Sequence, residues 1–343
     1  CTRGVYHRDL MKNFTTLLSA SVFSSALFSP LLQAQDHPPE IIVTANRTAN
    51  TTDETLSPVS IITRKDIERL QATSVTEVLA TTPGLDISQN GGFGSTTNLY
   101  MRGTNSNQIL VLIDGVPSGS ATVGTTPFQY LPVSQIERIE VVRGPHSSLY
   151  GSSAIGGVIQ IFTRKDYQGR SFSADVGYGS ENTSESNISY SHGNHNSGFH
   201  LGLGYQDSDG YNFLGDTPPD DDDDGFDNTS LSLGGYHQLT KQLKLSGTFL
   251  HSEGKSEFDG YSDKKTHTDY EQQIASLIAD YEVNDTWTTQ FQVGQSKDDL
   301  KNTLTASQTS RFKTNKDTFT WKNEFLVREA DLFTIGFDYL DEK

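Results

Sequence analysis

The carboxy-terminal half of the chain alternates between apolar and polar residues. In one run, Phe199, Leu201, Leu203 and Tyr205 alternate with His200, Gly202, Gly204 and Gln206. The same period recurs at 243–249, 287–293 and 333–339. A period of two residues is that of a β-strand with one apolar face. The pattern predicts about nine strands between residues 170 and 341.

The connections between these strands alternate in length. Short turns are predicted at 192–197, 239–242, 283–286 and 327–331, and long connections at 208–228, 254–267 and 297–313; the first connection, 179–183, is shorter than this rule requires. A soluble β-sandwich has the same period of two residues. Tight turns on one rim and long loops on the other are typical of an outer-membrane barrel. Segment 170–343 is therefore predicted to be part of a transmembrane antiparallel β-barrel.

Residues 56–165 have a different pattern, that of a small α+β domain. Strands are predicted at 58–63, 98–102, 109–113, 139–143 and 158–163. Thr63 with Asp66, and Ser74 with Glu77, have the spacing of helix-start capping boxes. Pro83 and Gly84 end the second predicted helix.

The amino-terminal region reads as an export signal followed by a tether. Met11 and Lys12 precede an apolar stretch at 17–32 and the small residue Ala34, which is the pattern of a secretory signal peptide at 11–34. Residues 1–10 are interpreted as upstream or artefactual sequence, and they contain the only cysteine, Cys1. Residues 35–55 are predicted to be a polar tether in the periplasm, since they follow the export signal.

Composition narrows the classes of function. The formal charge of −17 argues against a nucleic-acid partner, which needs clustered basic residues. The mean hydropathy of −0.50 does not exclude a membrane protein, because a spanning strand needs only about 9–11 residues with every second one apolar. The glycine-rich stretch 151–157 lacks the ending of a phosphate-binding loop, and the histidines are scattered. No enzyme and no organic cofactor are predicted.

One short segment of the tether is prone to form a strand. It consists of Glu40, Ile41, Ile42, Val43, Thr44 and Ala45 within 40–46, between two prolines and the polar stretch 48–55. With no local partner in the tether, such a segment is predicted to add as a strand to the sheet edge of another protein.

Three phrases of the sequence resemble the plug domain of TonB-dependent outer-membrane transporters. They are VTEVLATTPGLDIS at 75–88, LVLIDG at 110–115, and the order E-R-I-E-V-V-R-G-P, L-Y-G and A-I-G-G-V-I within 136–164. The resemblance implies a plug in the lumen of a barrel of about 22 strands, of which roughly nine are present here. It also implies a Gram-negative outer membrane with its lipid, and TonB with its inner-membrane energising complex as the partner of the 40–46 box. Bacteriocins or phage are possible further partners.

The resemblance assigns roles to several plug residues. Plug loops at 89–97 and 118–126 would face the cargo, so Gln89, Asn90, Gly91, Gly92 and Ser118 are the predicted substrate contacts. Arg102 and Arg143 lie beside glycines at strand ends. They are predicted to pair with acidic groups of the barrel wall; ordinary surface charge is the alternative.

An acidic run suggests a calcium site. Residues 220–225 satisfy the pattern D-x-D-x-D-G, whose oxygens suit a hard cation; Leu231 stands where an EF-hand needs glutamate. A solvated acidic run is the alternative. In cobalamin-transporting members of the family, aspartates of two adjacent outer loops bind calcium. By this resemblance Asp222, Asp224 and Asp259 are predicted ligands, and Asn212 stands where those members carry an aspartate.

These patterns together predict a transporter. The predicted function is TonB-dependent import of cobalamin or a related corrinoid, with calcium as the cofactor that orders the outer loops. A receptor for ferric siderophores is the first alternative, and a passive porin or adhesin is the second.

Overall fold

The computed structural model describes residues 41–42, 50–51, 58–122, 124–165, 168–213, 222–259, 266–305, 307–328 and 331–343. The predicted signal peptide and residues 1–10 lie outside these ranges, as do Glu40, Val43, Thr44 and Ala45 of the predicted box. Segment Ile41–Lys343 is one compact unit, and it contains both predicted domains.

Residues 58–165 fold as a small α+β domain, the class predicted for this part of the chain. Its sheet has the strand order β3-β8-β9-β6-β7, in which the β6 and β9 pair is parallel and the other pairs are antiparallel. The strands are β3 (Val59–Thr63), β8 (Ile136–Arg143), β9 (Gly157–Thr163), β6 (Ile109–Ile113) and β7 (Val116–Pro117). A separate hairpin joins β4 (Leu85–Gln89) to β5 (Thr97–Met101). The helices are α1 (Arg64–Leu70), α2 (Val75–Ala80) and the short α3 (Ser147–Tyr150).

The core of this domain is built from the apolar strands and one face of α2. Val75 and Val78 on α2 and Ile139 on β8 are fully buried, as is Ile159 on β9. Each such side chain contributes about 1.5–3 kcal/mol by leaving water. The domain is therefore built around a hydrophobic core, which Leu250 and Ile274 of the large sheet also join.

The two helix starts are capped in different ways. At α1 the Thr63 side chain accepts the N–H of Asp66, and the Asp66 carboxylate accepts the N–H of Thr63, so the predicted capping box is confirmed. At α2 the Ser74 side chain accepts the N–H of Glu77, but the Glu77 carboxylate accepts the N–H of Thr73 instead of Ser74. Both helices therefore begin at the predicted residues.

Replacing Thr63 with alanine is expected to lower the stability of α1 by about 1 kcal/mol, the usual cost of losing an N-cap. The hydrogen bonds from Thr63 lower the pKa of the Asp66 carboxyl. The stability that the ionised Asp66 carboxylate contributes is therefore fully present above the ordinary carboxyl pKa. It is lost as the pH falls through the lowered pKa of Asp66. Hydrogen exchange of the α1 amides measures the effect, with exposed Lys65→Ala as the control; equal exchange in both variants would contradict it.

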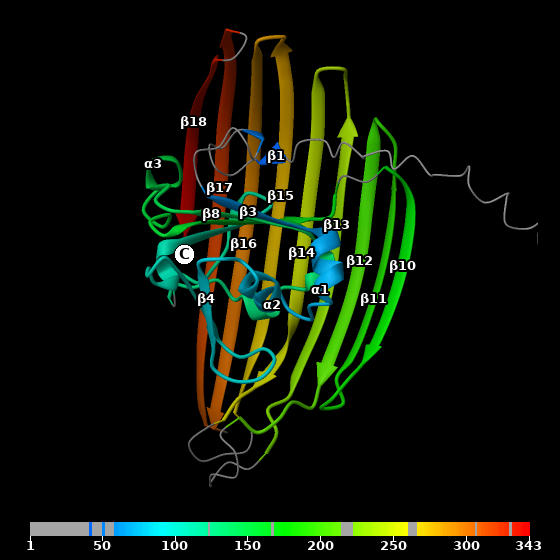
Figure 1. The fold of residues 1–343 in the computed structure, drawn as a ribbon, viewed down its shortest axis with the longest axis vertical. Coiled ribbons are helices and arrows are strands. Elements are labelled where there is room, and N and C mark those ends of the chain that lie inside the picture. Colours follow the sequence, from blue (N-terminus) through cyan, green and yellow to red (C-terminus); the bar gives the residue numbers. More distant parts are fainter. Residues whose placement is uncertain are drawn as a thin grey trace, which may run out of the picture. The chain divides into compact units, whose positions relative to one another are not determined.

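Nine antiparallel strands follow, in chain order from β10 to β18 (Figure 1). They are β10 (Gly169–Tyr178), β11 (Ser184–Gly193), β12 (Ser197–Ser208), β13 (Phe226–Gln238), β14 (Leu243–Glu257), β15 (His267–Asn284), β16 (Trp287–Thr305), β17 (Gln308–Arg328) and β18 (Asp331–Glu342). The predicted number of strands is confirmed, as are the short turn at 239–242 and the long connection between β12 and β13.

One predicted connection is wrong. The alternation of connection lengths predicts a long connection at 297–313, but β16 runs to Thr305 and β17 begins at Gln308. The charges pair across neighbouring strands: Arg311 donates to Asp299 at 2.7 and 2.8 Å, and Lys301 lies 3.3 Å from Asp269. Opposite charges facing each other across strands stabilise a sheet, so the strands extend through this region.

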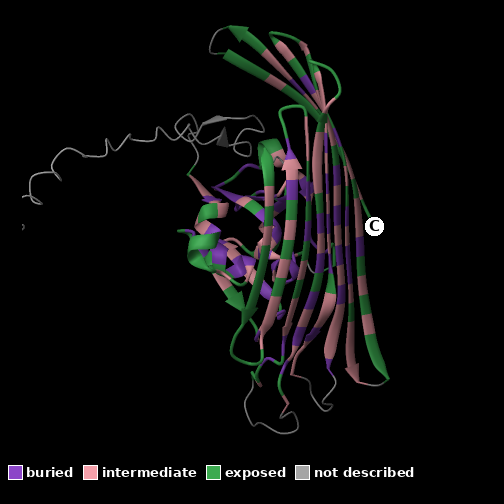
Figure 2. Ribbon diagram, turned by 90° about the vertical axis from the view of Figure 1, so that its right-hand side faces the viewer, coloured by how far each residue is buried: buried purple, intermediate pink, exposed green. Residues whose placement is uncertain are grey.

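The alternating exposure of the sheet matches the predicted faces (Figure 2). Phe199, Leu201 and Leu203 on β12 are exposed, whereas His200 and Gly202 between them are buried. In the described part of the chain, no helix is long and apolar enough to cross a membrane.

Candidate functional site

The first plug loop lies between β4 and β5 and brings four of the predicted substrate residues together. The Gln89 side chain donates to the Gly92 carbonyl at 2.6 Å, and the Ser95 hydroxyl donates to the same carbonyl at 2.8 Å. Gly91 has a φ of +143°, which favours glycine. Gln89 and Asn90 are exposed, whereas Gly92 is buried with its Cα facing the ring of Tyr211. The loop is therefore compact and presents Gln89 and Asn90 to solvent.

The second plug loop follows β7, and Ser118 lies at its base. The Ser118 N–H donates to Val111 at 2.9 Å, and its carbonyl accepts the Thr126 hydroxyl at 3.1 Å. Ser118 is buried, while Thr122 and Gly124 are exposed. The exposed part of this predicted loop, 118–126, thus lies a few residues beyond Ser118, which is the one residue of the loop that was named as a substrate contact.

A cavity of about 240 Å³ lies between the first plug loop and the sheet. Its lining includes Gln89, Gly92, Gln129, Gln206, Tyr211 and Asn228. The structure thus brings predicted plug residues together with sheet residues that were not predicted. The polar position of Gln206 in an alternating strand is the signal that could have found it, whereas Asn228 falls in the predicted connection 208–228 and carries no such signal.

The acidic loop follows β12, and its described first residues are bonded to its last ones. The Asn212 N–H donates to an Asp223 carboxylate oxygen at 3.2 Å, and the Phe213 N–H donates to Asp224 at 3.4 Å. Asp224 is buried and Asp222 is half-buried. Of the acidic run, residues 220 and 221 lie outside the described ranges.

The side chains of this loop carry oxygen atoms of the types that bind calcium. Both polar atoms of the Asn212 amide are buried without a hydrogen-bond partner, which is uncommon in native proteins, and an amide oxygen is a suitable calcium ligand. Among the described residues, however, no group of three or more His, Cys, Asp or Glu side chains is placed to hold a metal ion. Asp259 ends a described range, so the predicted set of Asp222, Asp224, Asp259 and Asn212 stays a prediction.

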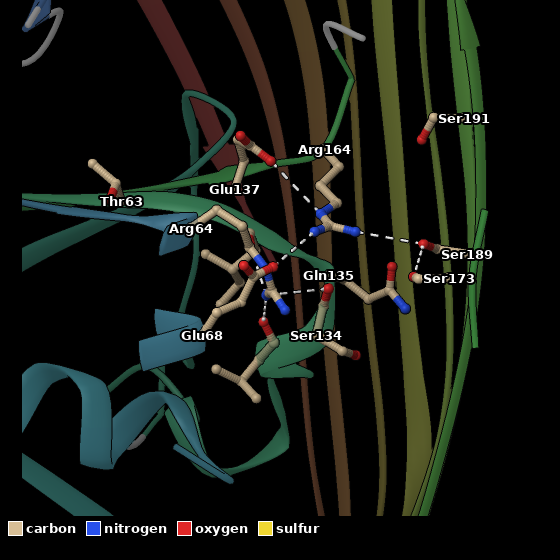
Figure 3. A network of polar contacts seen from close by, with 12 residues as sticks. Thr63, Arg64, Glu68, Ser134, Gln135, Glu137, Arg164, Ser173, Ser189 and Ser191 are labelled. Carbon is tan, nitrogen blue, oxygen red and sulfur yellow. Dashed lines mark hydrogen bonds and ion pairs between the residues drawn. The ribbon is translucent and has the colours of Figure 1, made fainter. Parts of the chain in front are cut away.

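A polar network joins α1 of the plug to the start of the sheet (Figure 3). The Arg64 guanidinium donates to the Val133 carbonyl at 3.0 Å and pairs with Glu68 at 2.9 Å. Arg164 lies 3.8 Å from Glu68 and donates to Ser189 of β11 at 3.5 Å. Burial, followed by the nearby charge of Arg64, lowers the pKa of Arg164. Arg164 therefore connects the first plug helix with the sheet.

The two predicted anchoring arginines have their described contacts within the plug. Arg143 donates to the Ser60 hydroxyl at 2.6 Å, and burial together with the neighbouring Arg102 lowers its pKa. Arg102 has a φ of +51°, is exposed, and its guanidinium approaches Gly144. Pairing of Arg102 or Arg143 with acidic groups of the barrel stays a prediction.

The contacts that the sheet makes with the plug are mostly neutral. Hydroxyl and amide groups on its inner face donate to plug carbonyls: Ser252 to Tyr130 at 2.7 Å, Gln292 to Asp114 at 2.8 Å and Ser296 to Pro117 at 2.9 Å. Sequence reasoning looked for charged pairs and missed these residues. Small polar residues at inward positions are also the general signature of a wet lumen, so the sequence alone did not distinguish plug contacts from water contacts.

The predicted box has a local strand partner. Ile41–Ile42 form β1, which pairs antiparallel with β2 (Asn50–Thr51). The expectation that this segment has no local partner is therefore wrong, because the polar stretch of the tether itself supplies one.

Comparison with known proteins decides the family. Residues 51–158 match the family model of the TonB-dependent Receptor Plug Domain. Vitamin B12 transporter BtuB of Photobacterium profundum is 34% identical over 320 residues, covering 92% of this chain and 52% of the relative. The protein of the same name from Vibrio cholerae serotype O1 is 32% identical over 331 residues, covering 93% and 54%. Residues 51–158 belong to the plug-domain family of TonB-dependent receptors.

Solved receptors of this family share the fold. The pyoverdine outer membrane receptor FpvA from Pseudomonas aeruginosa PAO1 matches with a TM-score of 0.73 at 16% identity, over 89% of this chain and 49% of the receptor. The siderophore receptor PirA from Acinetobacter baumannii matches with a TM-score of 0.68 at 19% identity, over 84% and 48%. The predicted plug and outer-membrane barrel strands are thereby confirmed. The chain spans about half the length of the curated relatives it matches.

Proposed function

We propose that this receptor imports cobalamin or a related corrinoid across the outer membrane, with energy delivered by TonB through residues 40–45. The observation that carries the proposal is the identity of about a third with vitamin B12 transporters, which extends over the plug and the sheet together. The structural neighbours that bind siderophores are less than 20% identical and support the fold alone.

The described loops suit the capture of a large polar cargo. Gln89 and Asn90 of the first plug loop are exposed, and the acidic loop begins where β12 ends. Bound calcium would supply positive charge that holds the loop carboxylates together. Asp222, Asp224 and Asn212, with Asp259 from the next loop, are the residues proposed to hold it.

Two further partners belong to the same proposal. Pairing with Asn50–Thr51 occupies backbone N–H and C=O groups of Ile41–Ile42. TonB would therefore pair with the box as an added strand once this local pairing opens. A bacteriocin is the second proposed partner; one structural neighbour is described as the FpvAI–pyocin S2 complex.

The test is binding of cyanocobalamin to outer membranes that carry this chain in its full reading frame. We expect tight binding in calcium and weaker binding in a calcium chelator. Excess ferric siderophore should not compete. If the siderophore competes, or binds when cobalamin does not, the proposed cargo is wrong and becomes a ferric siderophore. The assignment to the TonB-dependent receptors would not change.

A further inference from the structure

Four aromatic rings stack from the plug to the sheet and back to the plug. The centroid of Phe93 lies 6.5 Å from that of Phe226, Phe226 lies 6.2 Å from Tyr270, and Tyr270 lies 3.6 Å from Tyr130. The interplanar angles are 25°, 9° and 8°. Phe93 belongs to the first plug loop and Tyr130 to the 3-10 turn Phe128–Tyr130 that follows the second. The two sheet residues thus connect both loop regions of the plug.

A glycine in the intervening strand permits this stack. Phe226 begins β13 and Tyr270 lies on β15, with β14 between them. Gly254 of β14 is directly opposite Tyr270, and a Cβ added there would fall 2.1 Å from the Asp227 carbonyl and 2.8 Å from the Tyr270 hydroxyl. With glycine at this position, the Tyr270 hydroxyl donates to the Asp227 carbonyl at 2.8 Å. The ring of Tyr270 is therefore tied to the start of β13.

The plug side of the stack is held equally closely. The Tyr130 carbonyl accepts the Ser252 hydroxyl at 2.7 Å and the Asn228 amide at 3.2 Å. On the first plug loop, Gly94 has a φ of +72°, and a Cβ added there would fall 2.2 Å from the ring of Phe226. The backbone of that loop thus rests directly on Phe226, which is 4% exposed.

The position of Phe226 also depends on the acidic loop that precedes it. Asp224 is buried and accepts the Phe213 N–H, and the Gly225 N–H donates to Glu257 at 3.3 Å. Only Gly225 separates Asp224 from Phe226. A change in the order of this loop therefore moves a ring that touches both the first plug loop and Tyr270.

We propose that Phe226 is a positioning residue on the end of the acidic loop: it seats the first plug loop directly, and the turn that holds Tyr130 through the ring of Tyr270. Ordering of the outer loop and seating of the plug loops then occur as one event, so that a ligand held by the outer loop meets plug loops already in place. The proposal rests on the proposed function for the cargo, but the stack can be tested without cargo.

The first experiment measures exposure of the first plug loop. Ser95 is 8% exposed and lies next to Gly94, so Ser95→Cys in a Cys1→Ser chain reports whether the loop is seated. We expect Phe226→Ala to raise the maleimide labelling rate roughly tenfold, since two ring contacts are lost. Phe226→Tyr, which keeps the ring, and Phe249→Ala, on the lipid side of β14, should label at the parent rate.

A second variant approaches the same contact from the plug. Gly94→Ala places a methyl group against the Phe226 ring and should raise the labelling rate of Ser95→Cys. Heat-modifiable migration shows whether each variant has inserted into the membrane. If Phe226→Ala does not insert, Gly94→Ala still tests the contact. Unchanged labelling in an inserted Phe226→Ala or Gly94→Ala protein would overturn the proposal.

Cargo binding separates this inference from the proposed function. In Phe226→Ala, the calcium-dependent gain in cyanocobalamin affinity, typically about 5–150-fold for coupled sites, should shrink towards one. If the parent protein binds no cobalamin while the labelling rates change as expected, the cargo assignment fails and the positioning role stands. If the parent binds cobalamin and the labelling rates do not change, the positioning role fails and the cargo assignment stands.

Discussion

Replacing Val43 with proline is expected to reduce cobalamin uptake to background while surface binding persists. Strand addition to another protein uses backbone N–H groups of the box, and proline removes one and fixes φ. Cargo binding depends on outer loops and plug loops that do not include residue 43. Energised cells given labelled cyanocobalamin, assayed for uptake under growth conditions and for binding on ice, measure the two steps separately.

The matched control is a proline elsewhere in the tether. Thr55→Pro changes the same polar segment outside residues 40–46 and should leave uptake near the parent level. Normal uptake by Val43→Pro would contradict coupling through the box. Uptake that persists after collapse of the proton gradient would instead favour the passive-porin alternative.

The arrangement of strands was predictable because lipid and water impose opposite demands on the two faces of each strand. Leu201 and Leu203 face outwards and His200 faces the plug, as the alternation indicated. Strand ends were less predictable. Arg311 and Asp299 are charged, which is usual in loops, but they lie on the neighbouring strands β17 and β16 and pair within the sheet. Cross-strand pairing depends on the register, which is not visible along a single stretch of sequence.

The positions of the plug loops along the chain were predictable, but the contacts that these loops make were not. The glycine-rich first plug loop was located correctly, because the tight turns at Gly91 and Gly94 require glycine. Ser118 was assigned from its place in a loop, and its burial comes from bonds to Val111 and Thr126 that only the fold supplies. The aromatic contact of Phe226 with the plug joins residues more than a hundred positions apart, so no local pattern marked it.

Replacing both Asp222 and Asp224 with alanine is expected to remove the calcium dependence of cobalamin binding. The affinity in calcium should fall to that of the parent in chelator, because the carboxylates proposed to hold the cation are gone and chelation has nothing further to remove. Loss of the Asp224 contact with the Phe213 N–H will also loosen the loop. Titration of cyanocobalamin in calcium and in chelator measures both affinities.

The matched control removes the same charge elsewhere. Asp285 and Asp331 lie at the short-turn ends of β16 and β18, so Asp285→Ala with Asp331→Ala should leave the calcium response intact. Asn212→Asp provides the opposite change: a carboxylate replaces the buried amide, adds a negative charge to the proposed donor set, and should lower the calcium concentration needed for half-maximal binding. If the calcium response is unaltered in both the double alanine variant and Asn212→Asp, the acidic run binds no calcium and is ordinary surface charge.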